Sequence, residues 1–195
     1  MNQVTYAFLI TTLAGLSTMI GSLLIFYKKK TDNIITTSLA FASGVMMCVS
    51  ITDLIPESIS SLKTNFYVIP SILISLIFIV IGIIISISID KYLLENKDNN
   101  KLYRVGIISM LAIILHNIPE GIATFMASTT DISLGISLAI AIALHNIPEG
   151  ISISIPIYYA TNSRIKALSY TFLSGMSELV GAIITYLFLI FLLAY

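Results

Sequence analysis

The six-residue sequence His-Asn-Ile-Pro-Glu-Gly occurs twice in the chain, at residues 116–121 and at residues 145–150. The second copy begins 145 − 116 = 29 residues after the first. Within each copy the histidine and the glutamate are four residues apart, so on a helix they lie on one face, one turn apart. Two such pairs on neighbouring helices can converge on one point. An imidazole and a carboxylate from each helix form a site suited to a transition-metal cation.

Both copies stand within apolar segments long enough to cross a bilayer. Of the 195 residues, 57% are hydrophobic and 10% are charged, and the mean hydropathy is +0.98. Soluble proteins carry about 25% charged residues. The composition therefore predicts an all-α protein, a polytopic transmembrane helical bundle of the cell membrane. Cys48 is the only cysteine, which excludes an intrachain disulfide, and we expect it to be a small packing residue.

Six spans are predicted, separated by short polar segments. They cover residues 4–27, 34–61, 66–89, 102–128, 132–159 and 165–195. No linker is long enough to divide the chain, so residues 1–195 are expected to form a single transmembrane domain. The first apolar run is longer than the core of a signal peptide and has no basic segment before it, so we expect it to be retained as a span.

The basic residues predict how the chain is oriented. Nine of the ten fall in the first, third and fifth loops: Lys28, Lys29, Lys30, Lys91, Lys97, Lys101, Arg104, Arg164 and Lys166. Only Lys63 falls in a loop on the other side. By the positive-inside rule, loops one, three and five are expected in the cytoplasm and both termini outside.

Seven ionisable side chains fall within the predicted spans, away from the loop charges. They are Asp53, Glu57, His116, Glu120, His145, Glu149 and Glu178. A charged group at the bilayer centre costs about 2.5–3.5 kcal/mol on insertion scales, and the spans contain no mid-membrane lysine or arginine to pair with these. Either the carboxylates are protonated or a mobile cation occupies the cavity. Histidine beside carboxylate favours Zn²⁺, Fe²⁺, Co²⁺ or Mn²⁺, and the amide oxygens of Asn117 and Asn146 can add ligands.

Each motif copy carries a proline inside its span. Pro119 and Pro148 cannot donate a hydrogen bond to the carbonyl four residues earlier, so kinks and unpaired backbone oxygens are expected near the histidines. Irregular backbone at membrane depth is tolerated where it lines a cavity, a recurring feature of transporter ion sites. The glycines that follow, Gly121 and Gly150, allow close backbone approach.

Other polar residues in the spans leave alternatives open. Residues 53–57, Asp-Leu-Ile-Pro-Glu, are a degenerate third copy. We expect Asp53 to be a possible ligand, and Glu57 either to attract cations at the entrance or merely to end the helix in solvent. Glu178 is either a further ligand or a carboxyl group hydrogen-bonded to a helix neighbour. The small residues around Gly15 and Gly175 are expected to serve helix packing.

The duplicated motif resembles the helix 4 and helix 5 signatures of the ZIP (Zrt/Irt-like) divalent-metal transporters, and residues 53–57 and 174–178 resemble the ZupT-like bacterial branch. This resemblance implies a binuclear metal site between helices 4 and 5. Its primary ligands would be His116, Glu120, His145 and Glu149. Asn117, Asn146 and Glu178 would serve the second metal, with Glu120 and Glu149 bridging. The resemblance also implies transport into the cytoplasm, usually by a dimer with both termini outside.

The chain departs from this family in two ways. The family usually has eight spans, the first three related to the last three by an inverted repeat, whereas this sequence ends after the sixth. We expect it to lack the last two helices, either through truncation or as a shortened member. The third loop also lacks a histidine-rich tract, and its Glu95 and Asp98 are expected to be solvated charges.

The sequence thus predicts a membrane transporter that moves divalent transition-metal ions into the cytoplasm, zinc above all, with iron, manganese, cobalt or cadmium as lesser substrates. Its expected partners are metal ions, the bilayer and a second copy in a homodimer, with no nucleic acid. Two competitors are an intramembrane metalloenzyme and a non-transporting metal-binding membrane protein. The enzyme is disfavoured because the order His-x-x-x-Glu matches neither His-Glu-x-x-His nor Glu-x-x-His.

Overall fold

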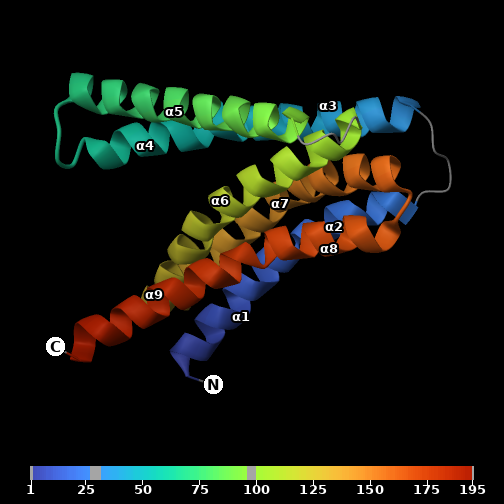
Figure 1. The fold of residues 1–195 in the computed structure, drawn as a ribbon. Coiled ribbons are helices and arrows are strands. Elements are labelled where there is room, and N and C mark those ends of the chain that lie inside the picture. Colours follow the sequence, from blue (N-terminus) through green and yellow to red (C-terminus); the bar gives the residue numbers. More distant parts are fainter. Residues whose placement is uncertain (1, 27–31, 96–99, 195) are drawn as a thin grey trace.

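A computed structural model describes residues 2–26, 32–95 and 100–194, and every element of secondary structure in these ranges is helical (Figure 1). The elements are α1 (Gln3–Leu16), α2 (Thr18–Ser22), the 3₁₀-helix η1 (Leu23–Phe26), α3 (Asp32–Val49), the π-helix η2 (Ser50–Leu54), α4 (Ile55–Leu62), α5 (Val68–Glu95), α6 (Lys101–Thr130), α7 (Ile132–Thr161), α8 (Arg164–Gly175) and α9 (Ser177–Ala194).

Six helical segments in the described part of the chain are long and apolar enough to cross a membrane. They are Gln3–Phe26, Asn33–Leu62, Val68–Ile89, Lys101–Thr130, Ile132–Thr161 and Arg164–Phe191. The predicted all-α bundle of six spans is therefore confirmed. Lys91 lies within α5, and Lys101 and Arg104 lie within α6, so these helices extend into what the sequence suggested was a loop. Lys28, Lys29, Lys30, Lys97 and Asp98 lie outside the described residues, and so does the side chain of Glu95.

Polar residues set the helix ends. Asn100 caps α6 by accepting hydrogen bonds from the backbone N–H groups of the next turn, and Asp131 and Ser163 do the same for α7 and α8. Such caps satisfy backbone donors that have no partner within the helix. Asn162 ends α7 in the left-handed conformation, with φ of 57°. The polar turns predicted between the last three spans therefore act as caps.

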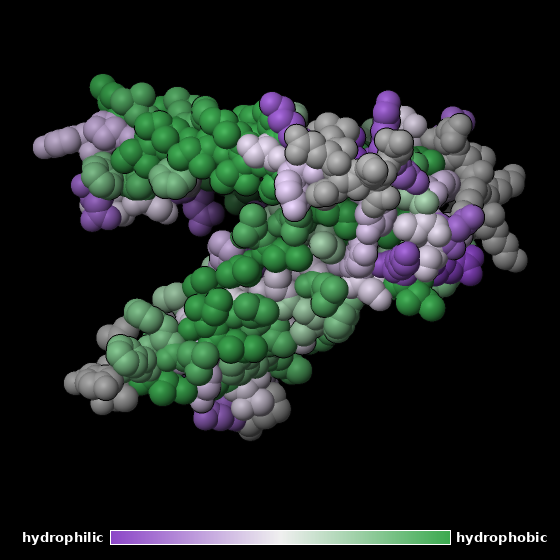
Figure 2. All heavy atoms as spheres, in the orientation of Figure 1, coloured by the Kyte–Doolittle hydropathy of each residue, from purple (hydrophilic) through white to green (hydrophobic). Residues whose placement is uncertain are grey.

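Four spans pack into a bundle with α7 at its centre, and α3 to α5 form an arm beside it (Figure 1). Residues 148–157 of α7 are buried on every side, which is unusual for a helix with polar residues. α3 packs along α7, whereas α4 packs against α5 and η2 and extends away from the bundle. Figure 2 shows the resulting wedge between arm and bundle, with apolar side chains over most of the visible surface.

The first and last spans repeat each other at a spacing of 160 residues. Residues 11–22 and 171–182 share threonine, leucine, glycine, serine and glycine at equivalent positions, and each span breaks into two helices near the middle of this segment. α1 and α2 pack against α7, as α8 and α9 pack against α6. The four spans are thus arranged with approximate two-fold symmetry, a relation for which the 160-residue repeat was the sequence signal.

Glycine makes these helix crossings possible. A Cβ on Gly15 would collide with the carbonyl oxygen of Gly175, and one on Gly175 with that of Gly15. Equivalent collisions would occur between Gly150 and Thr18, and between Gly121 and Glu178. The predicted packing role of these small residues is therefore confirmed, and it holds the spans at backbone contact distance.

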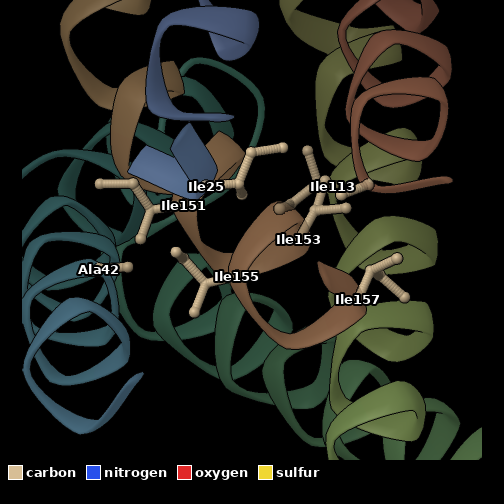
Figure 3. Packing of buried hydrophobic residues seen from close by; sticks show 8 residues of the cluster. Ile25, Ala42, Ile113, Ile151, Ile153, Ile155 and Ile157 are labelled. Carbon is tan, nitrogen blue, oxygen red and sulfur yellow. The ribbon is translucent and has the colours of Figure 1, made fainter. Parts of the chain in front are cut away.

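The main apolar core lies along the second half of α7. It consists of Ile25, Ala42, Ile113, Ile151, Ile153, Ile155, Ile157 and Ala167, seven of which are labelled in Figure 3. These side chains come from η1, α3, α6, α7 and α8, so one cluster ties the arm to the bundle. A smaller cluster of Ala7, Phe125 and Ala182 lies elsewhere in the bundle.

Replacing Gly15 by alanine is expected to lower the free energy of unfolding by about 1–3 kcal/mol, because the new methyl group meets backbone that cannot give way. The matched control is Gly82→Ala in α5, where a Cβ would meet nothing within 4 Å. This control should be neutral or stabilising by up to about 1 kcal/mol. Thermal unfolding of the detergent-solubilised protein, followed by circular dichroism, measures both. Equal effects would contradict the packing described for the first and last spans.

Candidate metal-binding site

The two motif copies lie side by side in the middle of α6 and α7, the pair of helices with the most extensive mutual packing. Both helices continue through their motif proline. The predicted kinks therefore do not interrupt either helix. Each copy turns its histidine and glutamate toward the other helix, as the four-residue spacing required.

A single carboxylate oxygen lies between the two imidazoles. Glu120 Oε1 is 3.0 Å from His116 Nε2 and 2.8 Å from His145 Nε2. Glu149 Oε1 is 3.8 Å from His116 Nε2. The structure thus brings the four predicted primary ligands together at the point where the two helices face each other.

The spacing of these atoms suits a metal ion. One ligand atom each from His116, His145 and Glu149 can be chosen so that all lie within 4.8 Å of one another. Zinc binds imidazole nitrogen and carboxylate oxygen at about 2.0–2.2 Å, so ligand atoms on opposite sides of one ion are separated by about twice that distance. A cation could therefore be held between α6 and α7 with small side-chain adjustments.

Two asparagines and a third glutamate lie deeper in the bundle. Asn117 and Asn146 are fully buried, and their amides donate to the carbonyls of Ser174 (3.3 Å) and Ala14 (3.0 Å). These carbonyls lie next to the breaks in the last and first spans. Because the amide nitrogen of each asparagine donates to one of these backbone carbonyls, its side-chain oxygen points away from that carbonyl.

Glu178 is also fully buried, and Asn146 donates a hydrogen bond of 2.6 Å to its Oε1. The partner lies on α7, so this hydrogen bond joins the last span to a motif helix. Glu178 occupies the position equivalent to Thr18 in the 160-residue repeat, and Thr18 instead donates to the carbonyl oxygen of Gly15 in its own span (2.7 Å). The approximate symmetry is therefore broken by one carboxylate.

Several oxygens of this cluster are buried without a hydrogen-bond partner. They are Asn117 Oδ1, Asn146 Oδ1, Glu120 Oε2, Glu149 Oε2 and Glu178 Oε2. Buried acceptors are normally satisfied, because an unpaired one costs about 1–3 kcal/mol, and more if it is charged. Five such oxygens in one region fit a set of ligands directed at cations.

The arm supplies one wall of a cavity beside the histidines. This cavity, of about 170 Å³, is lined by Met46, Val49, Ser50, Leu54, Ala112, Ile113, His116, His145 and Glu149. The first four belong to α3 and the π-helix η2, and π-helical turns occur often at functional sites. Met46 and Ser50 carry no signal of this role in the sequence, since both are ordinary residues of an apolar helix.

Of the two acidic residues in the degenerate third motif, Glu57 lies apart from the cluster, and Asp53 has a side chain outside the described part of the structure. Glu57 is exposed in the first turn of α4, on the part of the arm that leaves the bundle, so it is not brought together with the other ligands. Asp53 lies in η2 between two residues that line the cavity, Ser50 and Leu54. The side chain of Asp53 is outside the described part of the structure.

The fold and the cluster define a polytopic membrane protein with a candidate metal site inside its bundle. The family model for ZIP zinc transporters matches residues 95–189. The protein named zinc transporter ZupT of Clostridium perfringens is 43% identical over 95% of this chain and 76% of its own length. Those of Chlorobaculum parvum and Streptococcus mutans are each 42% identical, over 93% and 91% of this chain and 75% and 73% of their own lengths. The chain belongs to the ZIP family.

Replacing His145 by alanine is expected to weaken Zn²⁺ binding to the purified protein at least about tenfold, because it removes an imidazole from the centre of the cluster. Glu57→Gln removes a carboxylate outside the cluster and should leave the affinity of this site unchanged. Titration calorimetry of the detergent-solubilised protein compares the two variants. If both bind Zn²⁺ as the unmodified chain does, the ion is held elsewhere.

Proposed function

We propose that this chain carries Zn²⁺, with other divalent transition-metal ions as lesser substrates, across the membrane through the cluster between α6 and α7. One observation carries the proposal: imidazoles and carboxylates from a duplicated motif converge midway along two membrane-spanning helices. The relatives are named zinc transporters, which favours transport over the metalloenzyme and the non-transporting alternatives.

Two ions can be accommodated if the carboxylates bridge. The first would be bound by His116, His145 and Glu149 on the side that faces the cavity. The second would be bound by the unpartnered oxygens of Asn117, Asn146 and Glu178. Glu120 and Glu149 each have a second oxygen without a partner, so each could contact both ions. The asparagine amides, held by backbone carbonyls, would orient their oxygens toward the second ion.

Ion movement requires the wall formed by α3 and η2 to change its position. On one side of the cluster this wall bounds the cavity, and along α7 the isoleucine cluster fills the space between arm and bundle. The four spans of the bundle are fixed by backbone contacts at glycine, whereas α4 and much of α5 extend away from it. The arm is therefore the element that can move against a bundle that carries the ions.

The direction and the assembly also belong to this proposal. Loops one, three and five are cytoplasmic and both termini lie outside, as the basic residues suggest. Ions enter from outside, where the exposed Glu57 attracts them, and leave on the basic side. The chain functions in the cell membrane as a homodimer.

Uptake of radioactive zinc into proteoliposomes tests the transport proposal. The double variant His116→Ala with Glu149→Ala should reduce uptake to the level of empty vesicles, because it removes two ligands of the first ion. Lys63→Gln, an exposed change in the loop between α4 and α5, should leave uptake unchanged. Glu57→Gln should raise the KM for zinc, because fewer ions are attracted to the outer side, and should leave the maximal rate of uptake unchanged. Uptake that survives the double substitution would refute the proposed path, and binding without uptake would favour a non-transporting protein.

Cysteine labelling tests the orientation. Two single-cysteine variants are made in a Cys48→Ser background. Asn65→Cys places the cysteine between α4 and α5, and Asn162→Cys places it between α7 and α8. A membrane-impermeant maleimide added to intact cells should label residue 65 at once and residue 162 only after permeabilisation. The reverse pattern would overturn the assignment of the cytoplasmic side.

A further inference from the structure

A polar pocket lies at the end of the bundle where α6 begins, α7 ends and α8 begins, away from the metal cluster. It has a volume of about 210 Å³ and is lined by Asn100, Tyr103, Ala160, Thr161 and Lys166. Four of these five residues carry polar or charged side chains, in a chain that is 57% hydrophobic. The proposed transport uses none of them.

Among the described residues, basic side chains gather around this pocket. Lys166 lines it, and Lys101, Arg104 and Arg164 lie in the first turns of the same two helices. Neither α6 nor α8 has an acidic residue in its first turn. Figure 2 shows hydrophilic side chains gathered at this end of the bundle. The pocket therefore favours an anionic group.

The pocket lies at the ends of candidate spans, which is the level expected for lipid headgroups. Three membrane-spanning segments end or begin there, at Lys101, Thr161 and Arg164. The guanidinium of Arg164 lies over the rings of Phe26 (5.1 Å) and Tyr158 (6.0 Å). Aromatic and basic residues at the ends of spans mark the membrane interface. A phosphate group at this depth can belong to a phospholipid.

A separate apolar groove lies between α2 and α8. It is lined by Met19, Leu168, Ser169, Phe172 and Leu173, and the Phe172 and Leu173 side chains are 45% and 57% exposed. Ser169 and Leu173 follow Lys166 by three and seven residues, so all three lie on one face of the helix. Seven residues correspond to about 10 Å along the axis. A cationic pocket and an apolar groove in this arrangement match the two parts of a phospholipid.

We propose that this pocket binds the phosphate group of an anionic phospholipid, with Lys166 as the principal cationic contact and an acyl chain along the groove on α8. The lipid would join the ends of three spans at one membrane face. It would thereby stabilise the bundle independently of metal. The proposal does not depend on transport, because the residues involved are separate from the metal cluster.

Native mass spectrometry of the full chain in detergent, with added phosphatidylglycerol or phosphatidylcholine of the same acyl chains, tests this site. The unmodified protein should retain phosphatidylglycerol in preference to phosphatidylcholine. Lys166→Gln should weaken its retention about fivefold, the effect of one basic side chain near an anionic headgroup. Lys166→Arg should keep the charge and restore retention. Thermal unfolding of each variant verifies that the fold is intact.

The matched control is Lys63→Gln. It removes one exposed lysine that does not line the pocket and lies in the loop between α4 and α5. This variant should retain phosphatidylglycerol as the unmodified chain does. If both glutamine variants lose lipid equally, or if the two lipids bind alike, the proposal is overturned. Displacement of phosphatidylglycerol by inorganic phosphate at a concentration equal to that of the lipid would overturn the lipid assignment, and retention would support it.

Discussion

The structure depends on buried carboxylate oxygens that need a positive charge which the spans themselves do not provide. The sequence places no lysine or arginine near the middle of any span. Glu120 is shared by two imidazoles, yet its second oxygen and those of Glu149 and Glu178 are buried without a hydrogen-bond partner. A bare charge at this depth is costly. The stability of the bundle is therefore linked to what occupies the cluster, whether protons or metal ions.

Close helix packing and ligand geometry are two results of the same contacts. Glycines let the first and last spans touch the motif helices backbone to backbone. The carbonyls of Ala14 and Ser174, next to the breaks in those spans, then come within reach of the amides of Asn146 and Asn117. A bulkier residue at the crossings would move these carbonyls away and release the asparagines. The glycines at the crossings bind no ligand themselves, yet they determine how the side-chain amide oxygens of Asn117 and Asn146 are oriented.

A duplicated motif produces a site that is not symmetric. The two copies are identical in sequence, and the first and last spans contact them in equivalent ways. Two features break the equivalence. Glu178 takes the place that Thr18 has in the repeat, and α3 packs along α7 so that the cavity opens on one side of the pair. In the proposed two-ion arrangement, identical side chains would therefore lie in different surroundings, one ion facing the cavity and the other enclosed by asparagine and glutamate.

The helical membrane fold, the six spans and the placement of each motif's histidine and glutamate on one helix face could all be predicted from the sequence. These follow from local rules, because apolar length sets a span and a four-residue spacing sets a helix face. Sequence did not reveal that Glu120 lies between both imidazoles, that Glu178 contacts Asn146, or that Met46 and Ser50 line the cavity. It left open whether Glu57 attracts cations at the entrance or ends a helix in solvent, and its exposed place on the outer arm depends on how α4 leaves the bundle. Such relations join residues distant in the chain, so only the packing of helices could decide them.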